Sequence, residues 1–349
     1  MSYEKENVRY KRVKTFLTNP EFNGFTKNEL FIMAFIKKGW GQDIAALSNM
    51  AEAMANLYFS DKRNRDEYCH LINQVLKRAL HPSVNPYRKN FDKVRYLGKY
   101  GYYLEHLNII IGAQKRISNS TEFDSLNDRI SYHLIQNSLS YSNYHADLLP
   151  YATMKWSADQ AAILYSLWLY DKNRNSYISA ELKSKWIKYM DHNMKHSKTG
   201  LFKTEVLGSK KYSNQPRGCS LSYMIHYMAR FSKETASKQW KLYKKHMLKR
   251  FLGRLAFREF LEDYKGSWTP DSGPIIAGGG VAATGLGLNA ASTMKDKNTY
   301  KGLLKTMNPF HTTLNGAEKL IGNSVLTRIG TDLLASAIWL NAETKRDWF

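Results

Sequence analysis

Two neighbouring segments indicate the fold class most clearly: SADQAAILYSLWLYD at residues 157–171 and ISAELKSKWIKYMDHNMK at 178–195. Both repeat apolar residues at the three-to-four-residue spacing of an α-helix. The first contains the purely apolar run Ala161-Ala162-Ile163-Leu164, as expected of a helix surrounded by neighbours, whereas the second has lysine and glutamate at regular intervals, as expected of an outer helix. The two segments therefore predict a helical hairpin with one buried and one exposed member.

The same pairing recurs along the chain, and strand-like alternation is scarce. Helices are predicted at 42–58 with 63–80, 102–117 with 121–140, 218–231 with 233–251, and 278–293 with 297–306, followed by a last helix at 326–342. Five or six hairpins of ~50 residues, each with an inner and an outer member, predict an all-α fold in which the pairs close into an (α/α)6-type toroid. A linear helical solenoid is the competing architecture, and it would show a tighter sequence repeat. We expect one toroid domain over 1–349, with 1–26 as an N-terminal extension.

Long segments precede the predicted inner helices, and they are rich in Gly, Pro, Asn and Tyr: 82–101, 142–156, 196–217 and 252–277. Loops of this length in a compact domain are usually functional. In a ring of hairpins the N-termini of all inner helices open on one face, so their free N–H groups and positive dipole ends surround one depression. The long loops therefore predict a site on that face.

Composition sets the outer limits on function. The 349 residues include 43% hydrophobic side chains, with 8 Trp, 23 Tyr and 15 Phe but only 8 Pro, which excludes a disordered chain. The two cysteines, Cys69 and Cys219, exclude a disulfide-rich secreted scaffold. The net charge of +22 attracts anions, whether nucleic acid, an anionic membrane face, or acidic sugars and phosphates. Residues 240–250 are typical of an amphipathic helix with a basic outer face, either a solvated surface or a docking surface for anions or a membrane.

Targeting and membrane-spanning segments are not visible in the sequence. Residues 1–20 are polar and charged, and the longest apolar runs fall well short of the ~20 residues that a membrane span needs. We therefore expect a cytoplasmic protein, with an extracytoplasmic location left open because a leader could have been removed. Peripheral membrane contact stays open, nucleic acid is not the expected partner, and the oligomeric state is not indicated.

Polar and aromatic residues gather at the loop–helix junctions. These junctions read Trp40-Gly41-Gln42-Asp43, Tyr102-Tyr103-Leu104-Glu105-His106, Trp156-Ser157-Ala158-Asp159-Gln160, Pro216-Arg217-Gly218-Cys219-Ser220 and Trp268-Thr269-Pro270-Asp271-Ser272-Gly273-Pro274. Aromatic faces stack on sugar rings, while carboxyl groups act as acid, base or nucleophile. A carboxyl group enclosed by aromatic rings has a raised pKa, as a general acid requires. The junctions therefore predict a carbohydrate-processing site.

Asp159 and Asp271 are the leading catalytic pair, with Glu105 third and His106 assisting. The alternative for the aspartates is helix capping, in which the carboxylate only accepts hydrogen bonds from backbone N–H groups. A separation of ~5 Å between the two carboxyl groups would imply retention of configuration, and ~6.5–9.5 Å inversion.

The remaining candidates would bind the substrate. Tyr103, Trp156 and Trp268 are expected to stack on sugar rings, and Gln160 lies beside Asp159 in sequence. Arg217 is expected to hold an anionic group through its fork of donors, or else to form a buried salt bridge to one of the aspartates. Cys219 follows at the start of a predicted inner helix.

Cys219 admits two interpretations. A thiolate there would be stabilised by the helix dipole and by Arg217, which would make it reactive. A small buried thiol is the alternative, and the commoner outcome.

Motifs for cofactors and metals fail on inspection. Gly278–Ala283 satisfies G-x-G-x-x-A, but no strand of sufficient length precedes it. Asp171–Leu182 imitates the start of a calcium loop without its glycine or its closing glutamate, and His192 with His196 lacks the glutamate of a zincin. We therefore expect neither a cofactor nor a metal ion.

At these junctions the sequence resembles the six-hairpin (α/α) toroid superfamily of glycoside hydrolases, unsaturated-glucuronyl hydrolases and sugar epimerases. The resemblance covers roughly residues 40–342 in architecture, and its motifs are 156–160, 217–220 and 271–274, followed by Gly285 and Ala290–Ala291. The pattern is also similar to bacterial proteins related to linalool dehydratase/isomerase, a cofactor-free α/α-barrel enzyme in which acid residues and cysteines near the barrel mouth are implicated. Here Cys219 is the only thiol in a comparable place.

Three functions follow as expectations. The first is a carbohydrate-active enzyme, a hydrolase or lyase acting on an anionic saccharide through its carboxylates. The second is a cofactor-free dehydratase or isomerase of a small alcohol, which would depend on Cys219. The third is a non-catalytic binding protein that uses its basic surface, which predicts no convergent carboxylates and binding that collapses as salt rises.

Overall fold

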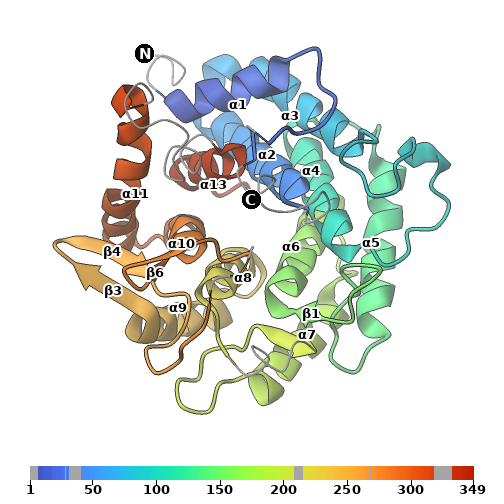
Figure 1. Ribbon diagram of the computed structural model, residues 1–349. Coiled ribbons are helices and arrows are strands. Elements are labelled where there is room, and N and C mark those ends of the chain that lie inside the picture. The colour runs from blue at the N-terminus through green and yellow to red at the C-terminus, as the bar shows by residue number, and fades with distance from the viewer. Residues whose placement is uncertain are drawn as a thin grey trace. The chain divides into compact units, whose positions relative to one another are not determined.

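The computed structural model describes residues 7–27, 29–30, 41–207, 215–267, 269, 271–317 and 332–349. These residues are predominantly helical, with three short antiparallel strand pairs among them (Figure 1). The chain divides into two compact units, and each is built from segments that are distant in sequence. The predicted catalytic and substrate-binding residues that the structure describes lie in the second unit, whereas Gln42 and Asp43 of the first junction lie in the first unit.

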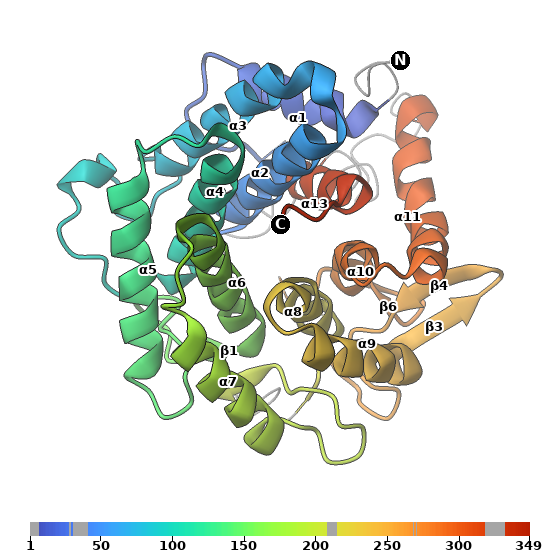
Figure 2. The same cartoon turned by 180° about the vertical axis from the view of Figure 1, so that it is seen from behind.

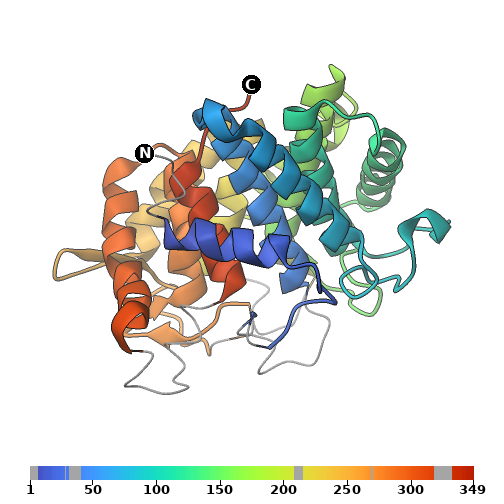
Figure 3. The ribbon, with the colours of Figure 1, turned by 90° about the horizontal axis from the view of Figure 1, so that it is seen from above.

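The first unit contains the described residues of Met1–Tyr96, Ile109–Thr121 and Met307–Phe349. Helix α2 packs against α3 and α13, and α1 lies against α3 and α13 as well (Figure 3). Its elements are α1 (Val8–Thr18), α2 (Gln42–Ser60), α3 (Arg65–Leu80), α13 (Leu333–Thr344), and two 3-10 turns at Lys62–Asn64 and Phe91–Lys93. The two ends of the chain therefore share one core.

Buried amides hold α2 and α13 together inside this unit. The Asn56 side chain donates to Asn341 Oδ1 (3.1 Å) and accepts a hydrogen bond from Trp348 Nε1 (2.8 Å). Asn341 in turn donates to Glu52 Oε2 at 2.6 Å, and Lys345 lies 3.9 Å from the same carboxylate oxygen. Because buried polar groups are costly unless they are paired, this network fixes how the two helices face each other.

The second unit contains Leu97–Asn108 and the described residues of Glu122–Thr306. Its helices are α4 (Gly101–Ser118, whose first turns belong here), α5 (Asp124–Leu139), α6 (Ser157–Arg174), α7 (Ala180–Asn193), α8 (Gly218–Phe231), α9 (Lys233–Met247), α10 (Val281–Thr293) and the first half of α11 (Lys297–Ala317). Its strands are β1 (Lys155–Trp156) with β2 (Glu205–Leu207), β3 (Leu248–Phe251) with β4 (Arg254–Phe257), and β5 (Ile275–Ile276) with β6 (Gly279–Gly280).

Helix α8 is central to the second unit, since it packs against α6 on one side and α10 on the other (Figure 2). Helices α5 and α9 lie outside this row, on α6 and α8 respectively. Aromatic rings fill the space between α6 and α8: Tyr227 stacks on Tyr165 with centroids 5.1 Å apart and meets Tyr223 edge-on at 4.8 Å. The predicted division into buried and exposed helices is therefore present here.

The predicted helices agree closely with the observed ones, and α8 begins and ends where the pattern placed it. The last predicted helix, 326–342, corresponds to α13, but 326–331 lie outside the described residues. The predicted helix 233–251 was wrong at its end, because the chain leaves α9 at Met247 and enters β3. The predicted start at 278 was also wrong, because Gly279–Gly280 form β6.

The β3–β4 and β5–β6 hairpins, which overlap the 252–277 segment, were not predicted from the sequence for a physical reason. The β3–β4 turn has only two residues, Leu252 (φ +45°) and Gly253 (φ +71°), and both lie in the left-handed region. Strands of two to four residues are too short to give a periodic signal. No helix among the described residues is long and apolar enough to cross a membrane.

Candidate active site

The N-terminal ends of α6 and α8 and the loop before β5 bring the predicted acids together. Asp159 is the third residue of α6, Arg217 is the residue before α8, and Asp271 belongs to the loop. Arg217 Nη1 lies 4.0 Å from Asp271 Oδ2, and the charge of Asp271 acts on Asp159. Segments more than a hundred residues apart in sequence therefore meet within this unit.

Asp159 has the titration behaviour expected of an acid at neutral pH. Burial raises its pKa to about 7, the negative charge of Asp271 adds to the rise, and its own backbone N–H opposes it. The side chain still keeps some contact with solvent. The N-cap of α6 is Trp156, whose side chain makes no capping hydrogen bond, and the Asp159 carboxylate accepts a hydrogen bond from its own backbone N–H.

Asp271 is the most accessible of the acids, with 49% of its side chain exposed. Burial raises its pKa above the ordinary value, and the positive charge of Arg217 partly opposes the rise. Burial raises the pKa of Asp159 and the charge of Asp271 adds to that rise, whereas the positive charge of Arg217 opposes the rise at Asp271 and favours its ionised form. Two neighbouring carboxyl groups held in different protonation states provide one acid and one base.

Glu105 lies on α4 and is fully buried. Burial raises its pKa well above the usual value, the charge of Asp159 raises it further, and the nearby Tyr223 hydroxyl opposes the shift. Neither carboxyl oxygen accepts a hydrogen bond of ordinary geometry from the described residues. His106 Nε2 lies 3.8 Å from Glu105 Oε1 and 3.0 Å from the Tyr223 hydroxyl. Glu105 is therefore a neutral carboxylic acid beside a buried histidine and tyrosine.

Arg217 is already engaged by protein groups. Its Nε donates to Glu259 Oε1 (2.9 Å), its Nη2 donates to Thr269 Oγ1 (2.6 Å), and the residue is 3% exposed. Burial lowers its pKa, but the carboxylates of Glu259 and Asp271 raise it and outweigh burial, so the guanidinium stays charged. The salt bridge considered from sequence is thus present, but its main acceptor is Glu259 rather than an aspartate.

Glu259 belongs to this candidate site and was not among the residues predicted from the sequence. It is buried, and besides Arg217 it accepts hydrogen bonds from the Cys219 backbone N–H (3.0 Å) and the Cys219 thiol (3.1 Å). It therefore caps the start of α8 from another part of the chain, where the helix dipole favours a negative charge. Its place between Phe257 and Phe260 was the available signal, since a lone acid among buried aromatic residues needs a partner.

Cys219 fits the interpretation of a buried thiol. Its side chain is 8% exposed, and burial raises its pKa well above the ordinary value, with the Glu259 charge acting in the same direction and Arg217 opposing it. The thiol is therefore protonated and donates to Glu259, so the dipole and Arg217 do not make it a thiolate.

The structure does not bring every predicted residue to the acids. Gln160 points to α5 and to the loop before α6: its Nε2 donates to Ser138 Oγ (3.1 Å) and its Oε1 accepts from the Ala146 N–H (2.9 Å). Tyr103 is buried on α4, and Trp156 is partly exposed at the end of β1. Trp40 and Trp268 lie outside the described residues. Among the described residues no group of three or more His, Cys, Asp or Glu side chains is placed to hold a metal ion.

Solved structures with similar folds include glycoside hydrolases. The α-1,6-mannanase GH76A of Salegentibacter sp. HEL1_6 matches with a TM-score of 0.56 at 11% identity, over 96% of this chain and 98% of that one. A family 76 glycoside hydrolase from a bovine Bacteroides thetaiotaomicron strain matches with 0.54 at 10% identity, over 88% and 70%. An α-amylase from Clostridium perfringens matches with 0.52 at 10% identity, over 85% and 86%.

No protein-family model and no curated protein matches this sequence. At 10–11% identity the structural likeness establishes the fold and leaves the reaction open. The chain has the all-α, (α/α)6 toroid fold found in these glycoside hydrolases.

Proposed function

We propose that this protein is a glycoside hydrolase whose acid is Asp159 and whose base or nucleophile is Asp271. The observation that carries the proposal is that two carboxyl groups lie close enough to interact: burial and the charge of Asp271 raise the pKa of Asp159 to about 7, and Arg217 lies 4.0 Å from Asp271. Glycoside hydrolysis needs one carboxylic acid to protonate the leaving oxygen and one carboxylate on the other side of the sugar ring. The acid works best when its pKa lies near the operating pH.

The roles of the three acids follow from how far each is exposed to solvent and from the charges of its neighbours. Asp271 is accessible to a substrate and lies 4.0 Å from Arg217, whose positive charge favours the carboxylate form. Asp159 keeps its proton because the Asp271 charge is close, and it can deliver that proton to a glycosidic oxygen. Glu105 is too deeply buried to contact a substrate. We therefore assign Glu105 and His106 to positioning Asp159, with which Glu105 interacts electrostatically.

The hydrogen bonds of Arg217 bear on whether the substrate is anionic or neutral. The Arg217 guanidinium already donates hydrogen bonds to Glu259 and Thr269. It therefore has fewer donors left to bind an anionic sugar than the sequence predicted. The similar structures include a mannanase, of which an inactive variant with two aspartates replaced was solved with α-1,6-mannotriose. We therefore place α-linked neutral hexose oligosaccharides first and uronic-acid oligosaccharides second.

The test is hydrolysis of defined oligosaccharides by the full-length protein. Release of reducing ends from α-linked manno- or gluco-oligosaccharides, lost by at least a thousand-fold in both Asp159→Asn and Asp271→Asn, would support the proposal. Uronic-acid oligosaccharides in a parallel series decide between neutral and anionic substrates, and an absorbance near 235 nm, from an unsaturated product, would identify a lyase instead. Full activity in either variant, with the fold intact, would contradict the assignment.

The dehydratase or isomerase alternative is tested by Cys219. That reaction would depend on the thiol, whereas a glycoside hydrolase of the proposed kind would not. The non-catalytic alternative predicted no convergent carboxylates, and the proximity of Asp159, Asp271 and Glu105 argues against it.

A further inference from the structure

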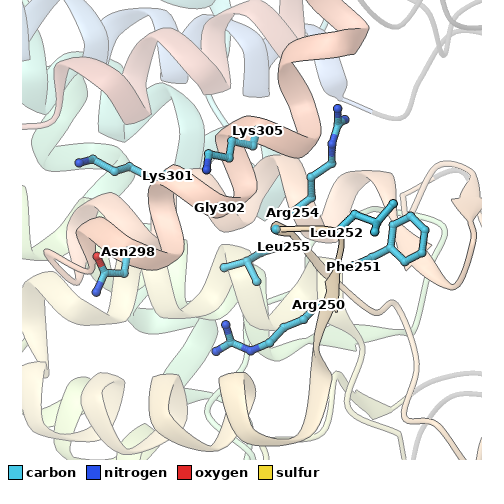
Figure 4. A pocket seen from close by; sticks show the side chains of 10 residues that line it. Arg250, Phe251, Leu252, Arg254, Leu255, Asn298, Lys301, Gly302 and Lys305 are labelled. Carbon is cyan, nitrogen blue, oxygen red and sulfur yellow. The ribbon is translucent and has the colours of Figure 1, made fainter.

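A second surface, lined by none of the candidate acids, combines positive charge with exposed apolar side chains. The β3–β4 hairpin and the first turns of α11 line a recess of about 450 Å³ (Figure 4). Four cations line it: Arg250 and Arg254 on the hairpin, Lys301 and Lys305 on α11. All four are exposed, and none has an ion-pair or hydrogen-bond partner among the described residues.

The hairpin tip is apolar where a soluble hairpin is normally polar. Phe251 is 64% exposed and Leu252 is 84% exposed, and they are the only adjacent pair of exposed large hydrophobic residues in the described part of the chain. Figure 4 shows both side chains directed away from α11. Exposed apolar side chains rimmed by charge mark an interaction surface.

The backbone conformation of the turn disfavours a leucine at position 252, so the stability of the fold does not account for this residue. Leu252 has φ +45° and Gly253 has φ +71°, a conformation in which Asn and Gly are favoured and a branched apolar residue is disfavoured. The side chain of Leu252 gains almost no burial in return. An apolar residue that costs backbone strain and packs against nothing points to a partner outside the chain.

The hairpin is held firmly in place against α11. Gly302 allows the close approach, because a Cβ there would lie 2.3 Å from the Leu255 side chain. Thr306 Oγ1 donates to the Leu255 carbonyl at 2.6 Å. The tip and the four cations are therefore presented together before any partner arrives, which lowers the entropic cost of binding.

We propose that this hairpin docks the protein on an anionic lipid bilayer, with Phe251 and Leu252 entering the headgroup–acyl boundary and Arg250, Arg254, Lys301 and Lys305 contacting the lipid headgroups. The apolar tip favours a membrane over a soluble polyanion, because a soluble polyanion offers no apolar region in which Phe251 and Leu252 could be buried. The +22 net charge draws the molecule toward an anionic surface from a distance. Two signals, one apolar and one electrostatic, are what stable peripheral binding requires.

The test is co-sedimentation of the full-length protein with vesicles of phosphatidylcholine alone and with 30 mol% phosphatidylglycerol. We expect at least ten-fold tighter partitioning onto the anionic vesicles, lost in 0.5 M salt. Lys301→Ala with Lys305→Ala should weaken binding by about 30-fold, since each cation near the surface contributes roughly five-fold. Lys172→Ala with Lys188→Ala, two exposed lysines on α6 and α7, is the matched control and should change binding by less than about three-fold.

Leu252→Asn separates docking from folding. Asparagine suits the left-handed turn, so the melting temperature should stay the same or rise, while vesicle binding should fall about ten-fold or more. Equal binding to both vesicle types, an unchanged affinity in Leu252→Asn, or the same loss in the control pair would each overturn the proposal. Tight binding of heparin that is indifferent to Leu252→Asn would identify the recess as a site for a soluble polyanion and would also overturn it.

Discussion

At the residue scale, the three acids differ most in their exposure to solvent. Glu105 is fully buried, Asp159 is partly exposed, and 49% of the Asp271 side chain is exposed. Burial penalises the charged form and raises the pKa of all three acids, and at Asp271 the positive charge of Arg217 opposes that rise.

Asp159 carries a prediction about stability and pH. Its folded-state pKa of about 7 lies above its ordinary value of 3.8, so the folded protein binds the proton more tightly than the unfolded chain. Stability therefore falls as pH rises from about 4 to about 7 on account of this group, and Asp159→Asn removes that loss. At pH 8 the variant should be more stable by roughly 1–3 kcal/mol, since one pKa unit corresponds to about 1.36 kcal/mol and residual solvent contact reduces the effect.

Urea unfolding at pH 4.5 and pH 8 measures this effect. Asp66→Asn, on the exposed first turn of α3, serves as the control and should not respond to pH in the same way. A variant that is less stable than the parent at pH 8 would show that the Asp159 carboxylate stabilises the folded protein.

Cys219 carries the second prediction. Cys219→Ala removes a hydrogen bond to Glu259 but no charge, so it should cost about 1–2 kcal/mol of stability and leave hydrolysis within about three-fold of the parent. Unfolding curves and kcat/KM measure the two effects. A thousand-fold loss of turnover in a folded variant would favour the dehydratase or isomerase chemistry over hydrolysis.

At the element scale, the start of α8 depends on a close approach that only glycine allows. A Cβ at Gly218 would lie 2.0 Å from the carbonyl oxygen of Arg258 and 2.8 Å from the Ala283 side chain. The Gly218 N–H donates to the Glu259 carbonyl at 2.8 Å, and the Tyr243 hydroxyl donates to the Gly218 carbonyl at 2.9 Å. This packing brings Glu259 to the N-terminus of α8, where it holds Arg217.

Gly218→Ala is therefore expected to be destabilising by about 2–4 kcal/mol, since the contact is with backbone that cannot move aside. The control is Gly253→Ala, where a Cβ would meet nothing within 4 Å and only the positive φ adds strain, so about 1 kcal/mol is expected. Thermal unfolding of both variants checks the order. An equal cost at the two positions would show that the packing at Gly218 can relax.

At the scale of the whole molecule, residues near the two ends of the chain complete one core. Trp348 is 6% exposed, its indole N–H donates to Asn56, and its backbone carbonyl accepts from Arg116. Trp348→Ala should therefore cost about 3–5 kcal/mol, as for other buried large side chains. Denaturant unfolding measures it, with Phe349→Ala as the control because that ring is 47% exposed. Similar losses in both variants would show that the contribution comes from the chain end in general.

The sequence alone determined which segments are helical and which helices are buried, because apolar spacing is a local property that one segment displays by itself. It also singled out Asp159, Asp271, Glu105 and Arg217 as candidates, since each lies in the first turn of a predicted helix or in the loop before one. Only the tertiary structure decided that Glu259 holds Arg217, that Gln160 turns away to Ser138, and that an apolar hairpin tip stands beside four cations. These relations join residues far apart in the chain, and the protonation order of the acids depends on burial and neighbouring charge, which exist only once the chain has folded.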